Sequence, residues 1–373
     1  MKRRIVGLDI VRVIAIILVM SLHFILNTGY YSIPLRGVGM FILTAYEWLA
    51  LPCIGLFLLL TGYFGYKGSL NKDFFYKLFK VVISYILISI IAVCFRIFYM
   101  HEDISLFGGI LRILNFEADG YAWYVEMYLG LFLLIPFLNI IYDYQKAKSY
   151  RRNIIIVFLL ITSVGPTFRF FVNSNFGYDI LPNHWILLYP ITYYFIGRYL
   201  RDYPLKFSFK KKFLILISTL LVQTSLCFFM NYGMLYPGTW FGFNDCGHFN
   251  LFTIIITIMI FSMFANVSIK NKIISKSIST ISLVTFEMYL ISWVVDRIIY
   301  KTGVFFDNVF EFFGYYVLYV GFDFIVSFVL AFIINKICVY LYKLIKPYYY
   351  KLLERFKFLK DGEVNEKSNV YSK

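Results

Sequence analysis

Residues 5–24 read IVGLDIVRVIAIILVMSLHF, an apolar run long enough to cross a bilayer that nevertheless contains Asp9, Arg12 and His23. Ionisable groups in hydrocarbon cost several kcal/mol each unless they are paired or face a wet cavity, so this run predicts a functional transmembrane helix. On a helical wheel, His23 returns to within about 20° of Arg12, with a rise of roughly 16 Å between them. Asp9 precedes Arg12 by three residues, a spacing at which a carboxylate and a guanidinium meet on a helix surface. One face of this helix is therefore expected to carry the charged groups, with the imidazole of His23 at its far end.

The composition of the whole chain is typical of an integral membrane protein. Of its 373 residues, 60% are hydrophobic and only 15% are charged, and the mean hydropathy is +0.72, well outside the range of soluble domains. The five cysteines are scattered singly, so they are interpreted as small buried apolar residues rather than as a disulfide framework. Asp9 and Arg12 interrupt the apolar run after the basic N-terminus, which argues against a cleaved signal peptide.

Apolar stretches of spanning length predict an all-α bundle of about ten transmembrane helices. They lie at residues 5–26, 40–65, 77–99, 121–142, 153–171, 185–201, 212–231, 249–266, 279–299 and 314–342. The connections alternate between Lys- and Arg-rich and nearly base-free, which predicts that both termini are cytoplasmic. This distribution also accounts for the net charge of +15 without nucleic acid as a partner. We expect a transmembrane domain over residues 1–345 and a basic, disordered cytoplasmic tail over residues 346–373.

Arg12 and His23 are the first candidates for chemistry. In the predicted orientation Arg12 lies in the cytoplasmic half, where a guanidinium is suited to binding phosphates. His23 lies towards the outer face, where an imidazole can act as a base or accept an acyl group transiently. The structural alternative is that Arg12 only pairs with Asp9 and that His23 is a buried hydrogen-bonding histidine.

Other ionisable residues are predicted to form an inner and an outer layer. The inner layer contains Lys77, Lys80, Arg198 and Glu287. The outer layer contains Glu47, Glu126, Asp296, Asp323, Arg169 and His184, with Asp245 and His248 in the long loop. Outer carboxylates could orient His23 or bind sugar hydroxyls, whereas Asp296 could instead pair with Arg297. The lysines and Arg198 could simply anchor helix ends at the headgroups. No cluster has the spacing of a metal site.

Several stretches resemble the membrane-bound acyltransferase-3 family. The arginine and the histidine separated by ten residues in the first helix, Arg12 and His23, preceded by Leu8-Asp9, resemble the hallmark of that family. Weaker matches are Leu56 to Tyr63, Lys77-Leu78-Phe79-Lys80, Trp123 to Leu138, Tyr194-Phe195-Ile196-Gly197 and Phe286 to Ile291. Four positions differ from the usual pattern: Lys77 and Lys80 of the basic element stand in place of arginines, and Tyr121 and Ser292 occupy positions that often hold histidine.

The resemblance implies that acetyl-CoA or another acyl-CoA donates an acyl group from the cytoplasm to a hydroxyl at or beyond the outer face. It also implies that Arg12, Lys77 and Lys80 lie near the CoA phosphates and that His23 is the base or acyl relay. We predict an O-acetyltransferase of the bacterial cytoplasmic membrane. Asp9 and Glu126 are predicted as further catalytic residues, and Arg198 as a further CoA contact. Its acceptor would be a cell-surface polysaccharide or the lipid-linked precursor of one.

Two other classes of protein fit the same composition. A transporter or flippase for a polysaccharide intermediate would use Arg12 and His23 to line a substrate path. A non-catalytic assembly subunit of a polysaccharide synthase would not depend on His23 at all. Binding of acetyl-CoA discriminates the enzyme from the flippase, because a flippase has no use for that donor.

Overall fold

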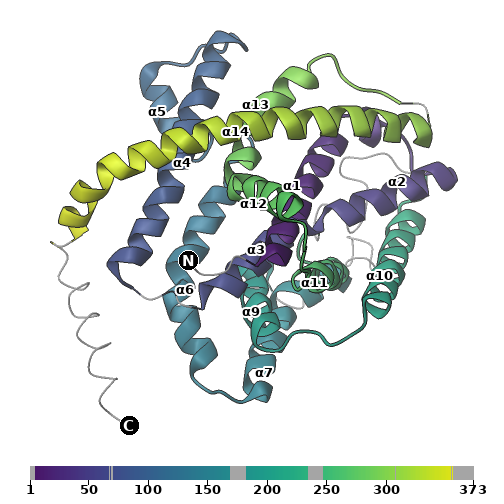
Figure 1. The fold of residues 1–373 in the computed structure, drawn as a ribbon. Helices are drawn as coiled ribbons and strands as arrows, with labels where there is room; N and C mark the ends of the chain where they lie inside the picture. The colour runs from purple at the N-terminus through teal and green to yellow at the C-terminus, as the bar shows by residue number, and fades with distance from the viewer. Residues whose placement is uncertain are drawn as a thin grey trace. The chain divides into compact units, whose positions relative to one another are not determined.

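The computed structural model describes residues 5–66, 68, 70–168, 182–233, 247–306, 308–353 and 355, and all regular elements in these ranges are helices (Figure 1). In the first half of the chain they are α1 (Val6–Leu26), η1 (Gly29–Ser32), α2 (Gly37–Ala50), α3 (Pro52–Gly65), α4 (Lys72–Phe98), α5 (Leu106–Leu114), α6 (Trp123–Asp143), α7 (Lys148–Leu159), η2 (Leu160–Val164) and α8 (Gly165–Phe168). In the second half they are η3 (Asn183–Leu188), α9 (Tyr189–Asp202), α10 (Phe209–Met230), α11 (Leu251–Phe264), α12 (Lys272–Leu283), α13 (Thr285–Ile299) and α14 (Val309–Leu353).

The prediction of an all-α membrane protein is confirmed. Seven segments of the described chain are long and apolar enough to cross a membrane, or eight if the bent pair α12 and α13 forms one span. The seven are α1, α2 with α3, α4, α6, α7 to α8, α10 and α14. Of the other predicted crossings, α9 and α11 are helices of 14 residues each. The predicted run at 279–299 is divided between α12 and α13, which are bent by 65° at their junction.

The chain separates into two compact units. The first unit contains residues 1–64, 145–285 and 295–326. The second unit contains residues 65–144, 286–294 and 327–373. Both α13 and α14 contribute to each unit, so neither unit is a continuous stretch of chain.

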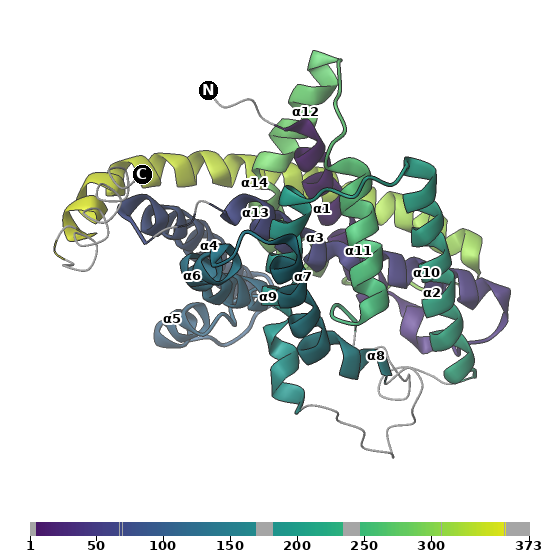
Figure 2. The same cartoon turned by 90° about the horizontal axis from the view of Figure 1, so that it is seen from below.

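In the first unit, α1 packs against α2, α11 and α12, and α10 lies beside α11 (Figures 1 and 2). Gly7 lets α1 approach the end of α11 closely, because a Cβ at this position would collide with the backbone carbonyl of Ala265. The same reasoning applies to α3 and α9, where Gly62 faces the backbone of Tyr194 and Gly197 faces that of Leu59. Both glycines belong to stretches that resemble the acyltransferase-3 family, and in this chain both lie where two helices pack closely.

Proline determines where α2 ends and α3 begins. Pro52 has no N–H to continue the helical ladder, and the last bond before it runs from Leu51 N–H to the Glu47 carbonyl. The Leu51 carbonyl accepts a hydrogen bond of 3.1 Å from Nδ1 of the half-buried His248. Desolvation lowers the pKa of His248, and the hydrogen bond stabilises the break. We therefore interpret His248 as a structural residue.

In the second unit, the carboxylate of Glu287 joins three helices. It accepts hydrogen bonds from Ser84 of α4 at 3.1 Å and from Asn335 of α14 at 2.9 Å. The chain entering α4 is held by Asn139 of α6, whose amide donates to the carbonyls of Gly65 and Gly68. Polar groups thus hold this unit together at points where apolar packing alone would not specify the register.

Candidate active site

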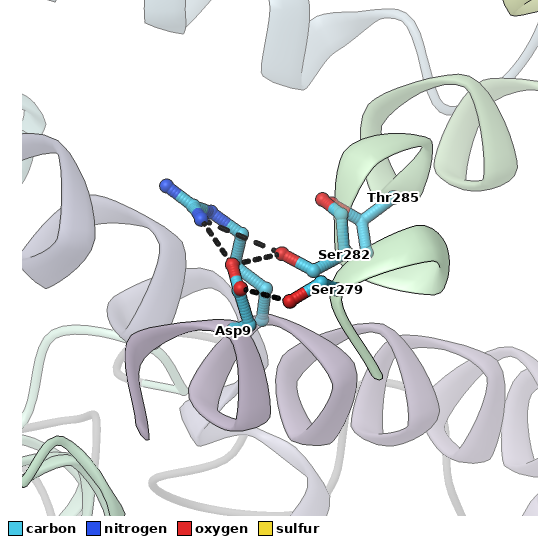
Figure 3. Close-up of polar contacts among 5 residues, drawn as sticks. Asp9, Ser279, Ser282 and Thr285 are labelled. Atoms are coloured by element: carbon cyan, nitrogen blue, oxygen red, sulfur yellow. Dashed lines mark hydrogen bonds and ion pairs between the residues drawn. The ribbon is translucent and has the colours of Figure 1, made fainter. Parts of the chain in front are cut away.

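Asp9 is the centre of a polar cluster in the first unit, where α1 meets α12 (Figure 3). Its Oδ1 atom accepts hydrogen bonds from Ser282 Oγ at 2.7 Å and from Arg12 Nη1 at 3.0 Å. Its Oδ2 atom accepts one from Ser279 Oγ at 2.8 Å. Asp9 is only 1% exposed, and a buried carboxylate is stable in such a place when its lone pairs are used. The predicted pair of Asp9 and Arg12 is therefore present, within a larger network.

The guanidinium of Arg12 is partly accessible, unlike its partner carboxylate. The Arg12 side chain is 28% exposed, and its Cζ atom lies 4.9 Å from the centre of the Phe64 ring. A hydrogen bond of 3.4 Å to Ser282 Oγ adds to the contact with Asp9. The guanidinium is thus held by Asp9 and Ser282 and is partly exposed, and a guanidinium in such a place is suited to binding a phosphate.

His23 and Asp296 form a second centre, near the other end of α1. The Nδ1 atom of His23 lies 3.3 Å from Oδ2 of Asp296, on α13. Both residues are buried, at 6% and 2% exposure. Asp296 is one of the outer carboxylates proposed to orient His23, and it is in contact with the imidazole. At this distance the two groups can form an ion pair, and a carboxylate beside Nδ1 favours the tautomer that carries the proton on Nδ1 and the acceptor lone pair on Nε2.

Tyrosine rings and a second carboxylate surround this centre. Phe24, the residue after His23, packs against the rings of Tyr300, Tyr316 and Tyr319. Burial raises the pKa of Tyr300, and the nearby carboxylates of Asp296 and Asp323 raise it further. Asp296 and Asp323 are 2% and 1% exposed, so Tyr300 lies beside two buried carboxylates. Burial strengthens the electrostatic interactions between such groups.

Glu47, another outer carboxylate, has a different set of partners. Its Oε2 atom accepts a hydrogen bond from Tyr30 at 2.8 Å and its Oε1 atom accepts one from Tyr31 at 2.5 Å. Burial raises the pKa of Tyr30 well above its usual value, and the Glu47 carboxylate adds to this effect. These bonds hold η1, the short helix after α1, against α2.

The remaining predicted residues are distributed over both units. Arg198 belongs to the first unit and is only 4% exposed, so its side chain does not extend to the surface as headgroup anchoring would require. Lys77, Lys80 and Glu126 belong to the second unit, where all three side chains are exposed. Arg169 and Asp245 lie outside the described residues.

Ser279 and Ser282 were not among the predicted site residues. Their spacing of three places them on one face of α12, which was a usable signal. What the sequence lacked was any indication that this face meets Asp9. The tyrosines beside His23 were missed for the same reason, since they lie about 280 to 300 positions further along the chain.

Comparison with known proteins identifies the family. A family model described as an acyltransferase domain, Acyl_transf_3, matches residues 5–334, which include both polar centres and all the predicted site residues. Searches of curated proteins and of solved structures give no significant match. Because the matched region covers most of the 373 residues, the chain belongs to the acyltransferase-3 family.

Proposed function

We propose that this membrane acyltransferase transfers an acetyl group from acetyl-CoA to a hydroxyl of a cell-surface polysaccharide or of its lipid-linked precursor. The observation that carries the proposal is the buried contact between His23 and Asp296 inside a family-matched acyltransferase domain. A membrane-embedded imidazole oriented by a carboxylate is suited to proton transfer near neutral pH.

In the proposed reaction, the Asp296 carboxylate beside Nδ1 stabilises a proton on that nitrogen, and Nε2 accepts the proton of the acceptor hydroxyl. The acceptor oxygen attacks the thioester carbonyl, its C–O bond forms, and the C–S bond of the donor breaks. The proton on His23 then passes to the departing CoA thiolate, so the histidine returns to its initial state. A transient acyl-histidine is the variant of this scheme in which Nε2 attacks the thioester first.

Arg12 is proposed to bind a phosphate of the donor through its partly exposed guanidinium, with Asp9 fixing its orientation. Arg198, Lys77 and Lys80 remain candidate donor contacts on the basis of the family resemblance. For Glu126, the structure offers no more than an exposed carboxylate in the first turn of α6.

We also propose a topology of about ten spans with both termini in the cytoplasm of a bacterial cell. The support for this topology is the alternation of basic and base-free connections along the sequence. It places Arg12 towards the compartment that supplies acyl-CoA and His23 towards the outer face.

The test is the O-acetyl content of surface polysaccharide, measured by proton NMR, in cells that carry wild-type protein, His23→Ala or His184→Ala at matched membrane abundance. His184 is an exposed histidine of the same unit and serves as the control. We expect the acetyl signal to disappear only in His23→Ala while polymer export continues. Failure of export would indicate a transporter, and unchanged acetylation would indicate an assembly subunit.

A further inference from the structure

The last helix continues well beyond the predicted membrane span. α14 contains 45 residues and ends at Leu353, so at roughly 1.5 Å per residue it is far longer than the hydrocarbon core of about 30 Å. The predicted span ended at residue 342 and the predicted disordered tail began at residue 346. Residues 343–353 are helical instead, and we name this part the α14 extension.

Aromatic contacts within the second unit explain why the α14 extension is ordered. Tyr349 stacks on Phe79 of α4, with ring centres 4.2 Å apart and planes inclined by 6°. The Tyr349 hydroxyl donates to the Phe75 carbonyl at 3.2 Å, and Tyr350 donates to Asp73 at 2.8 Å. The α14 extension therefore packs along the first turns of α4 (Figure 1).

This packing gathers positive charge from two distant parts of the sequence. The exposed lysines are Lys77 and Lys80 on α4 and Lys343, Lys346 and Lys351 on the α14 extension. Lys80 lies 6.0 Å from the Tyr342 ring, and Lys346 lies 4.9 Å from the ring of Tyr76, which itself stacks on Tyr342. Residues 336–353 contain no acid, and the one acid of residues 70–80, Asp73, accepts a hydrogen bond from Tyr350. We call these five lysines the basic patch.

Large apolar side chains are exposed between the lysines of the α14 extension. Tyr348 is 78% exposed, Leu344 52% and Leu352 50%. Alternation of lysines with exposed apolar and aromatic groups, next to a membrane span, is typical of a helix that lies in the headgroup region. A soluble phosphate ligand would use the lysines but would give no reason for these apolar groups to be exposed.

We propose that the basic patch and the α14 extension bind the headgroups of anionic phospholipids, with Leu344, Tyr348 and Leu352 inserted between the lipids. Each lysine near an anionic lipid surface contributes a favourable electrostatic interaction, and clusters of four to eight basic residues beside a span are typical of such sites. Because Lys77 and Lys80 are also candidate donor contacts, the test changes only the three lysines of the α14 extension.

The experiment measures lipid retention by the full-length protein in detergent, with native mass spectrometry after addition of phosphatidylglycerol or phosphatidylcholine. The test variant is Lys343→Gln/Lys346→Gln/Lys351→Gln. The control is Lys206→Gln/Lys210→Gln/Lys211→Gln, which removes the same charge from exposed lysines before and at the start of α10. A variant with arginine at the three α14 positions tests whether charge is sufficient.

We expect the glutamine variant to retain at least about tenfold less phosphatidylglycerol than wild type, with the control and the arginine variant within about twofold. Equal losses in the glutamine variant and the control would overturn the proposal, as would no preference for phosphatidylglycerol over phosphatidylcholine. If the glutamine variant fails to fold, Tyr348→Ser, at an exposed position, is expected to weaken retention, and unchanged retention would overturn the proposal.

The KM for acetyl-CoA, measured in neutral nanodiscs, distinguishes two possible ligands of the basic patch: a lipid headgroup and the phosphates of the acyl donor. The proposal predicts the same KM for wild type and the glutamine variant. A raised KM with normal lipid retention would assign the patch to the donor and overturn the lipid proposal. Retention is measured without turnover, so its result does not depend on whether the proposed acyl transfer is correct.

Discussion

The two polar centres on α1 differ in how their carboxylates are used. Asp9 accepts hydrogen bonds from Arg12, Ser279 and Ser282, and the two serines belong to α12. Asp296 instead lies beside the imidazole of His23, next to Tyr300. A carboxylate held by three donors is suited to fixing a charge in place, whereas one paired with an imidazole is suited to moving a proton. The same helix thus carries a positioning centre and a candidate catalytic centre.

The largest expected effect comes from Asp296→Asn. The amide cannot hold the Nδ1 proton of His23 as the carboxylate does, so we expect kcat to fall by about 10² to 10⁴ with little change in the KM for acetyl-CoA. Steady-state kinetics in detergent or nanodiscs measure both constants. Asp103→Asn, at an exposed loop position, is the control. A raised KM with normal kcat would instead make Asp296 a donor-binding residue.

Asp9→Asn tests the polar centre around Asp9. It leaves the Arg12 charge without its partner and weakens the attachment of α1 to α12, so we expect a loss of about 3 kcal/mol in stability. We also expect a higher KM for acetyl-CoA, with kcat changed less than in Asp296→Asn. Thermal unfolding and the same kinetic assay provide the two readouts. Loss of kcat alone, without destabilisation, would contradict the positioning role.

Asp119, in the loop before α6, is a buried carboxylate whose hydrogen bonds and neighbouring charge do not offset the cost of its burial. Burial raises its pKa to about 6, although the N–H groups of Tyr121 and Ala122 and the charge of Arg96 oppose the shift. The pKa of Asp119 in the folded state exceeds the unfolded value of about 3.9, so between these two pH values the folded state binds more protons than the unfolded state. The free energy of unfolding therefore falls as the pH rises from about 4 to 6, by at most about 3 kcal/mol. Asp119→Asn should flatten the stability profile between about pH 4 and 6. The unfolding temperatures of wild type and Asp119→Asn, measured across this pH range, test the prediction. Parallel profiles for the two proteins would refute it.

The smallest effects are expected for Ser279→Ala and Ser282→Ala. Each removes one donor to Asp9, so we expect about 1 kcal/mol of destabilisation per substitution and a modest rise in the KM for acetyl-CoA. Ser277→Ala, at an exposed position of the same helix, should be silent. If it destabilised as much as Ser282→Ala, the effect would belong to α12 itself rather than to its contact with Asp9.

The sequence alone was sufficient for the class of the protein and for its family. Hydrophobic runs of spanning length predict helices because a helix satisfies all backbone hydrogen bonds within one segment, as the lipid interior requires. The spacing of Asp9, Arg12 and His23 is a local property of one such run. The family assignment from these residues is confirmed by the match over residues 5–334. The exact number of crossings could not be read in the same way, because α9 and α11 are short and α12 bends into α13.

Only the tertiary structure decided which groups the charges of α1 meet. Ser279, Ser282 and Asp296 are about 270 positions from their partners, and hydropathy does not specify which helix faces pack together. The continuation of α14 to Leu353 likewise depends on ring stacking and hydrogen bonds to α4, which no local pattern in a Lys- and Tyr-rich stretch could indicate. Local periodicity therefore determines the helices and the candidate charges, while packing between distant segments determines which charges are paired and which are open to a ligand.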